Sequence, residues 1–77
     1  GKSVSKVDYG RCLLGSILQE KRMSQVELAA LTSITPIEIS YYIHNQRRMS
    51  LKTAKTISDA LNVTIEDLYE WISNNHS

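Results

Sequence analysis

The stretch Thr35-Pro36-Ile37-Glu38 combines several independent signals for the start of a helix. Thr35 can act as the N-cap, and Pro36 stands at the first helical position, where a backbone N–H would lack a helical partner anyway. Glu38, three residues after the cap, can bond back to the backbone of Thr35 and complement the helix dipole. These four residues therefore predict a helix that begins at Pro36.

A second helix start lies eleven residues upstream, in Ser24-Gln25-Val26-Glu27, where Ser24 and Glu27 have the spacing of a capping box. Two helices that begin so close together leave room for only a tight turn between them. We expect that turn at residues 32–34, with Ile34 reaching the core. This spacing is what a helix-turn-helix reader of DNA requires.

Length and composition limit the chain to a small domain without a membrane span. A chain of 77 residues buries only about 60% of its unfolded surface. No apolar run approaches the ~20 residues of a spanning helix, and no signal-peptide pattern is present. Cys12 is the single cysteine, so an internal disulfide and a multi-cysteine zinc site are excluded. A reducing cytoplasm is the expected location.

Charge is distributed unevenly along the chain. The net charge is only +1, but residues 1–25 carry five basic and two acidic groups. Residues 50–77 carry two basic and four acidic groups. We therefore expect one end of the molecule to be positive and the other negative.

Apolar periodicity predicts five helices and no strand. Residues 1–7 are expected to form a flexible tail, and residues 8–77 a single all-α domain, a compact five-helix bundle. Asp8 would cap the first helix, Ser50 the fourth, and Thr64 with Asp67 the fifth, while Asn62 would end the fourth in a left-handed conformation. The expected helices cover residues 8–21, 25–31, 36–44, 51–61 and a last segment that begins at residue 65.

Each expected helix has an inward face. These faces are predicted to carry Leu14, Ile17, Leu18 and Lys21; Leu28, Ala29 and Leu31; Ile39, Tyr42 and Ile43; Leu51, Ala54, Ile57, Ser58 and Leu61; and Ile65, Leu68, Tyr69 and Ile72.

The outward face of helix 36–44 is unusual for a solvated surface. Ile37, Tyr41 and His44 fall together there, flanked by Glu38 and Ser40. One interpretation is a helix buried on two sides, or isolated apolar residues at the surface. The functional interpretation is a face that enters a DNA groove. Ile37 could then contact a thymine methyl, Glu38 could accept from a cytosine amine, and Tyr41 could bond a phosphate or a base edge.

A joint pattern of motifs runs through residues 14–68. It consists of Met23-Ser24-Gln25-Val26-Glu27-Leu28-Ala29, Ile34-Thr35, Ile39-Ser40, Asn45-Gln46-Arg47-Arg48-Met49-Ser50-Leu51 and Ile57-Ser58-Asp59-Ala60-Leu61-Asn62-Val63. With this pattern, residues 14–68 resemble the helix-turn-helix domain shared by phage Cro and cI-type repressors and many small bacterial regulators, the Xre family. The resemblance implies a lambda-repressor-like fold in a bacterial or phage-encoded protein, with helix 36–44 in the major groove.

The resemblance also implies roles for individual residues, although each could instead be an ordinary solvated side chain. Pro36, Ile37 and Tyr41 take positions that touch bases, and Glu38 and Ser40 flank them. The expected contacts to the DNA backbone are Gln25, Thr35, His44, Asn45, Gln46, Arg47 and Arg48.

Two departures from the family pattern stand out. Ser33 and Asn45 occupy positions where many relatives have Gly, so a left-handed backbone at Ser33 would be mildly strained. Leu18 and Ile43 replace an Arg–Glu pair, and because both are apolar no buried charge is left without a partner.

The function expected from the sequence is a sequence-specific regulator of transcription, repressor-like, that binds double-stranded DNA. A homodimer would read a roughly palindromic operator with half-sites about 34 Å apart. Its interface is expected at Tyr69, Trp71 and Ile72, unless Trp71 only covers the core of its own domain.

Two other function classes are alternatives to DNA binding. An antitoxin-type or adaptor module could use the Ile37/Tyr41 face to bind a protein. An enzyme is not expected, since the sequence has neither paired carboxylates in an evident pocket nor a phosphate-binding glycine loop. No cofactor, metal or small-molecule ligand is indicated.

Overall fold

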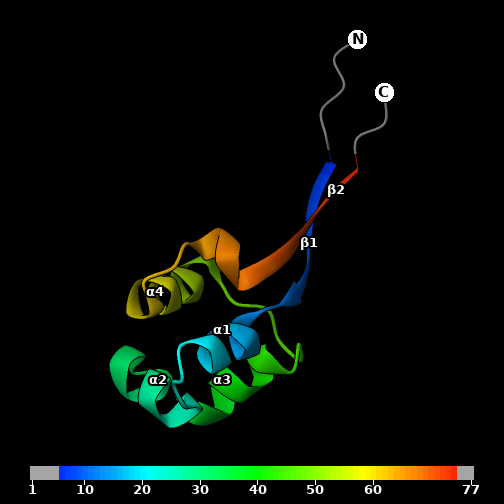
Figure 1. Ribbon diagram of the computed structural model, residues 1–77. Helices are drawn as coiled ribbons and strands as arrows, with labels where there is room; N and C mark the ends of the chain where they lie inside the picture. Colours follow the sequence, from blue (N-terminus) through cyan, green and yellow to red (C-terminus); the bar gives the residue numbers. More distant parts are fainter. Residues whose placement is uncertain (1–5, 75–77) are drawn as a thin grey trace.

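A computed structural model describes residues 6–74, with side-chain surroundings for residues 8–72. The helices form a body from which a two-stranded ribbon rises (Figure 1). In chain order the elements are β1 (Lys6–Cys12), α1 (Leu14–Glu20), α2 (Gln25–Thr32), α3 (Pro36–Ile43), α4 (Leu51–Leu61), the 3-10 helix η1 (Ile65–Leu68) and β2 (Tyr69–Asn74). The expected all-α five-helix bundle is therefore wrong. Over residues 6–74 the structure has four α-helices, one 3-10 helix and a two-stranded antiparallel sheet.

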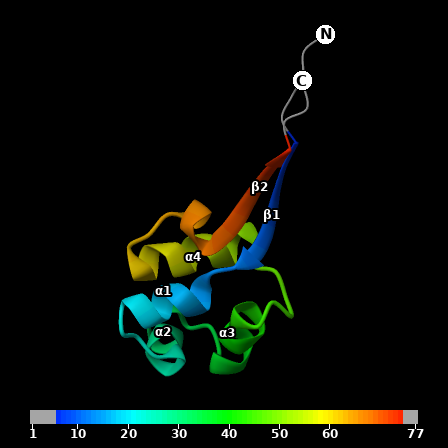
Figure 2. The same ribbon diagram turned by 45° about the vertical axis from the view of Figure 1, so that its right-hand side comes forward.

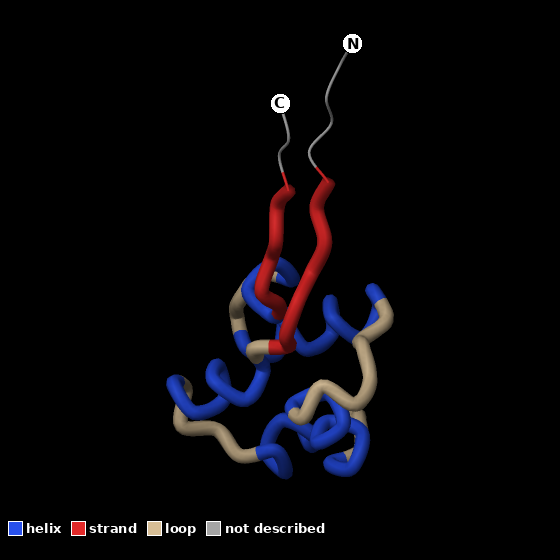
Figure 3. The backbone as a smooth tube through the Cα atoms, turned by 90° about the vertical axis from the view of Figure 1, so that its right-hand side faces the viewer, coloured by secondary structure: helices blue, strands red, loops and turns tan. Residues whose placement is uncertain are grey.

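The ribbon joins the two ends of the described chain. β1 and β2 run antiparallel, and Tyr9 lies opposite Trp71 while Cys12 lies opposite Tyr69. Three steps along β1 thus match two steps along β2, which is a β-bulge. Figures 2 and 3 show both strands rising clear of the helices beyond the base of the ribbon.

The helix expected over residues 8–21 is a strand followed by a shorter helix. Asp8 caps no helix, because its carboxylate accepts a hydrogen bond of 2.8 Å from the N–H of Tyr9 within β1. Helix α1 begins only at Leu14, and Lys21 follows its end as an exposed residue. Of the tail expected over residues 1–7, residues 1–5 lie outside the described residues, and Lys6 and Val7 begin β1.

The expected fifth helix is one turn long. The capping box of Thr64 and Asp67 forms as predicted, with bonds of 3.0 and 3.3 Å. At Tyr69 the backbone becomes extended, with φ −137° and ψ 153°. The following residues pair with β1, which begins more than sixty positions earlier in the chain. Contact across that distance overrides the helical pattern.

Helices α2, α3 and α4 confirm their predicted starts. Ser24 and Glu27 form the capping box of α2, with bonds of 3.1 and 3.0 Å. Ser50 caps α4, and Asn62 ends it in the left-handed region at φ 58°. No helix in the described part of the chain is long and apolar enough to cross a membrane.

The core lies between the four helices and the base of the ribbon, and it contains most of the residues predicted to face inward. Leu31, Leu51 and Ile72 were expected inside but are exposed. Leu31 lies near the end of α2, Leu51 begins α4, and Ile72 belongs to the ribbon instead of a helix. The buried side chains include Leu14, Ile17, Leu18, Leu28, Ile39, Tyr42, Ala54, Ile57, Ser58, Leu61, Leu68 and Tyr69.

Candidate nucleic-acid interface

The start of α3 is held by Thr35, as the sequence predicts. Its hydroxyl accepts a hydrogen bond of 3.2 Å from the N–H of Glu38, and Pro36 occupies the first turn. The return bond from Glu38 to Thr35 does not form. The Glu38 carboxylate accepts instead from the hydroxyl of Tyr42, one turn later, at 2.9 Å. Glu38 is therefore fixed in place along the side of α3.

The bond to Glu38 also affects Tyr42. Burial is the main cause that raises the pKa of Tyr42 above its ordinary value, and the neighbouring Glu38 carboxylate raises it further. Tyr42 therefore stays protonated and donates to Glu38 at neutral pH.

The exposed face of α3 is the predicted one. Ile37 is 67% exposed and Tyr41 is 40% exposed, while Ile39 and Tyr42 are buried on the opposite side. Pro36 is exposed beside them and Ser40 is half-buried. Helix α3 thus presents an apolar and aromatic surface outward, while its opposite side is packed into the core.

His44 folds back onto the end of α3. Its Nδ1 lies 2.9 Å from the carbonyl oxygen of Ser40 and 3.3 Å from the Ser40 hydroxyl. Nδ1 is therefore engaged within the helix, and Nε2 is the ring nitrogen that remains for a partner outside the protein.

The two consecutive arginines after α3 point to different parts of the molecule. The guanidinium carbon of Arg47 lies 5.2 Å from the centre of the Tyr41 ring, on the exposed face of α3. The guanidinium carbon of Arg48 lies 4.1 Å from the centre of the Tyr9 ring in β1, and its Nη1 donates to the Tyr9 carbonyl at 3.4 Å. Interaction with the Tyr9 side chain is the main cause that raises the pKa of Arg48.

Asn45 connects the same loop to the ribbon. Its backbone is left-handed at φ 60°, and its side-chain oxygen accepts a hydrogen bond of 2.6 Å from the N–H of Cys12. Gln46 is exposed and continues from α3 through a backbone bond of 2.8 Å to Tyr41. In the loop of residues 45–48, Asn45 and Arg48 are therefore held by β1, whereas Gln46 and Arg47 are not.

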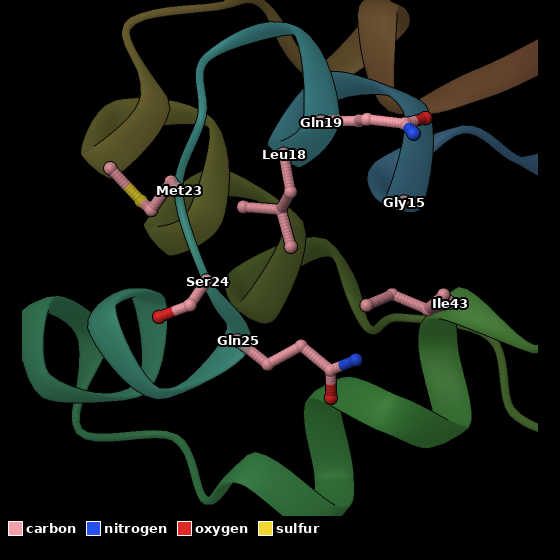
Figure 4. A pocket seen from close by; sticks show the side chains of 7 residues that line it. All are labelled: Gly15, Leu18, Gln19, Met23, Ser24, Gln25 and Ile43. Atoms are coloured by element: carbon pink, nitrogen blue, oxygen red, sulfur yellow. The ribbon is translucent and has the colours of Figure 1, made fainter.

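An open pocket of about 460 Å³ lies where α1, α2 and α3 meet (Figure 4). Leu18 and Ile43 line it together, as their shared departure from the family pattern suggests. A side chain at Gly15 would come within 3.1 Å of Ile43, so glycine permits this close approach. In Figure 4, Gln25 extends from the start of α2 toward α3 along the rim of the pocket.

The residues expected at a dimer interface differ in exposure. Tyr69 is buried, its ring packs edge-on against Tyr9 at 5.0 Å, and its hydroxyl accepts from the N–H of Met49 at 2.9 Å. Trp71 is 46% exposed and Ile72 is 50% exposed. Only the last two therefore present side chains at the surface of the ribbon.

Sequence reasoning missed Tyr9 and Cys12 as partners of this loop. They lie 39 and 33 positions away from Arg48 and Asn45, and no local pattern connects such distant residues.

Burial raises the pKa of the Cys12 thiol. Within the described residues, no group of three or more His, Cys, Asp or Glu side chains could hold a metal ion.

Comparison with known proteins identifies a matching family and a similar protein. The family of the Cro/C1-type HTH DNA-binding domain matches residues 14–74, from the start of α1 to the end of β2. The chain is also similar to YopS, an uncharacterized HTH-type transcriptional regulator derived from the SPbeta prophage of Bacillus subtilis strain 168. The two are 36% identical over 72 residues, which are 92% of this chain and 97% of YopS.

Proposed function

The chain belongs to the family of Cro/C1-type helix-turn-helix DNA-binding domains, and from this premise we propose that it is a transcriptional repressor that binds its operator as a homodimer. Helix α3 enters the major groove and α2 crosses the DNA backbone. The observation that carries the proposal is the exposed face of α3. It presents Ile37 and Tyr41 outward from a helix that Thr35 caps and the core anchors.

The base contacts in this proposal come from the first two turns of α3. Ile37 meets a thymine methyl, and Tyr41 bonds a base edge or a phosphate. Glu38, held by Tyr42, accepts from a cytosine amine. Pro36 and Ser40 lie beside these residues and limit how closely the groove approaches.

The phosphate contacts surround that face. Gln25 and Thr35 stand at the starts of α2 and α3, where the helix dipoles favour negative charge. His44, Gln46 and Arg47 follow α3. Asn45 and Arg48, which the sequence also placed on the DNA backbone, already bind β1, so we assign them to holding the loop.

Binding to a protein is the alternative function for the same face. Pro36 offers no side-chain hydrogen bond and Ile37 reads only shape and methyl groups, so this surface has few groups with which to distinguish bases. An antitoxin-type or adaptor domain would use the same two residues as apolar anchors.

Selection of bound sequences from random double-stranded DNA at a stated salt concentration tests the proposal. We expect an enriched, roughly palindromic sequence with half-sites about 34 Å apart. The Ile37→Ala and Tyr41→Ala variants should shift the selected sequence and lose roughly 1–3 kcal/mol at the base pairs involved. If no sequence is enriched, the protein-binding alternative replaces DNA reading.

The repressing role needs a separate test. With the selected operator overlapping a reporter promoter, expression should fall when the protein is produced. The Ile37→Ala variant, tested in parallel, should restore much of that expression. A rise in expression with the wild-type protein would contradict repression while leaving DNA binding intact.

A further inference from the structure

Hydrogen bonds link the ribbon to both ends of the loop that follows α3. At the start of the loop, the N–H of Cys12 donates to the Asn45 side-chain oxygen at 2.6 Å. At its end, the N–H of Met49 donates to the Tyr69 hydroxyl at 2.9 Å. Figure 2 shows the loop running from α3 to the base of the ribbon. The ribbon therefore fixes the loop on both sides of its middle residues.

The bond made by Tyr69 is buried. Tyr69 is 7% exposed and Met49 is 9% exposed, so the Tyr69 side chain offers DNA almost no surface to contact. A buried N–H that loses its acceptor carries the full cost of its desolvation. Without the Tyr69 hydroxyl, Met49 would have to move toward water, and the end of the loop would move with it.

The middle of the loop has the opposite surroundings. Gln46 and Arg47 are both exposed, and the Arg47 guanidinium lies over the Tyr41 ring on the exposed face of α3. A loop that is already fixed loses less conformational freedom when DNA immobilises it, and therefore binds more tightly than a loose one. The two bonds to the ribbon thus favour the binding of phosphate by the residues between them.

We propose that Tyr69 is a positioning residue for DNA binding. Its hydroxyl holds Met49, and through it the loop, in the place where Arg47 meets a phosphate. The proposal deepens the proposed function, because it rests on the phosphate contact assigned there to Arg47. Phosphate contacts carry no sequence information, so this contribution to affinity is the same for every DNA sequence.

Tyr69→Phe tests the role of the hydroxyl, because it keeps the ring. With the variant folded by circular dichroism, its dissociation constant for dye-labelled DNA should rise about threefold to tenfold for each bound chain. The rise should be equal for the selected operator and for unrelated DNA. The slope of log affinity against log salt concentration should stay that of the wild type, since Arg47 still reaches its phosphate in the complex.

Ser58→Ala is the matched control. The Ser58 hydroxyl is also buried, but it lies in α4 and donates to the Lys55 carbonyl at 2.9 Å. Its loss should lower the thermal midpoint of unfolding and leave the dissociation constant for DNA unchanged. If Ser58→Ala weakens DNA binding as much as Tyr69→Phe does, Tyr69 has only a structural role and the proposal is wrong.

A double-mutant cycle with Arg47→Ala tests whether Tyr69 acts through the arginine. In that background, Tyr69→Phe should raise the dissociation constant by less than about twofold, because the side chain that the loop positions is absent. An equal rise in both backgrounds would overturn the proposal.

Asn45→Gly is a second variant, at the other end of the loop. It keeps the left-handed backbone, at φ 60° in the wild type, and removes the bond to Cys12. It should weaken DNA binding in the same direction, and again less in the Arg47→Ala background. This variant keeps the proposal testable if Tyr69→Phe does not fold.

Hydrogen exchange without DNA tests the position of the loop by itself. The N–H of Gln46 donates to the Tyr41 carbonyl at 2.8 Å, so its exchange rate reports opening of the loop. In Tyr69→Phe this amide should exchange about fivefold faster than in the wild type. In Ser58→Ala it should exchange at the wild-type rate.

The measurements separate the two proposals. If the chain selects a DNA sequence and Tyr69→Phe binds it as tightly as the wild type, the positioning role is overturned and the proposed function remains. If the chain selects no sequence while Gln46 exchanges faster in Tyr69→Phe, the proposed function is overturned together with the role of Tyr69 in DNA binding, and only the hold on the loop remains.

Discussion

Arg47 and Arg48 are neighbours in the chain, yet the structure gives them different surroundings. Arg47 lies over Tyr41 on the exposed face of α3, and Arg48 lies over Tyr9 in the ribbon. From the sequence alone, Arg47 and Arg48 form one basic pair with the same expected role. Their aromatic partners separate them into an arginine available to DNA and an arginine that holds the loop to β1.

This separation predicts different effects of replacing each arginine. Arg47→Ala should lower the slope of log affinity against log salt concentration by about one unit, because one phosphate contact is lost. Arg48→Ala should leave that slope unchanged and lower the thermal midpoint of unfolding. DNA binding measured over a series of salt concentrations, together with thermal melts, tests whether each arginine contacts phosphate or holds the loop. Equal changes of slope in both variants would place both arginines on phosphate.

Two left-handed residues provide a second contrast at this scale. Ser33 has φ 62° and Asn45 has φ 60°, a region that costs a residue with a Cβ roughly 1–2 kcal/mol. Ser33→Gly should therefore raise the free energy of unfolding by about 0.5–1 kcal/mol, after the greater flexibility of unfolded glycine is subtracted.

Asn45→Gly is the matched comparison. It relieves a similar backbone conformation, but it also removes the oxygen that accepts from Cys12. We expect no gain in stability, or a loss, when both variants are unfolded in urea. If the two glycines stabilise the protein equally, the bond between Asn45 and Cys12 contributes nothing.

At the scale of elements, α3 is held from its inner side by Tyr42 and its bond to Glu38. Because the pKa of Tyr42 is higher in the folded protein than in the unfolded chain, the protonated hydroxyl contributes stability that is fully present below about pH 10. That stability is lost as the pH rises through the folded pKa.

The wild-type protein should therefore lose stability above about pH 10 more steeply than Tyr42→Phe, which has no hydroxyl to ionise. Glu38→Gln should keep most of the dependence, since burial is the larger cause of the shift. Urea unfolding at a series of alkaline pH values measures both. Parallel curves for the wild type and Tyr42→Phe would rule out this contribution.

The elements that the sequence predicted well are those specified by nearby residues. Helices α2, α3 and α4 have their caps at Ser24, Thr35 and Ser50, and their apolar spacing fits one buried face. The same local information predicts the exposed face of α3, because Ile37 and Tyr41 must point away when Ile39 and Tyr42 point inward. The outline of the candidate site could thus be predicted from the sequence.

The ribbon could not be predicted in this way. Its strands are far apart in the chain, and the bulge between Tyr9 and Cys12 disturbs the alternation that identifies a strand. Asp8 and the capping box at Thr64 both fit a helix start. The capping box at Thr64 does form, but the helix that it begins is a single 3-10 turn. The roles of Asn45 and Arg48 were missed for the same reason, since both bind β1.

At the scale of the whole molecule, Tyr9 joins the ribbon to the helical body. Its ring contacts Tyr69 at 5.0 Å and Trp71 at 5.7 Å, and Arg48 lies on it. A half-buried ring with these neighbours makes the ribbon part of the folded unit.

Tyr9→Ala should lower the free energy of unfolding by about 2 kcal/mol, less than for a fully buried ring. Tyr9→Phe, which keeps the ring, should lower it much less. Urea denaturation followed by circular dichroism measures both. An alanine variant as stable as the wild type would mean that the ribbon is only loosely attached to the body.

Trp71 is the single tryptophan of the chain, and its Nε1–H donates to the Glu66 carbonyl at 2.7 Å on the surface of the ribbon. The aromatic residue on the exposed face of α3 is Tyr41, which has no indole ring. Indole fluorescence therefore reports on the ribbon and on the adjoining η1. A titration can therefore follow changes at the ribbon through tryptophan emission. DNA binding by α3 can be followed in the same sample through a dye on the DNA, without any added label on the protein.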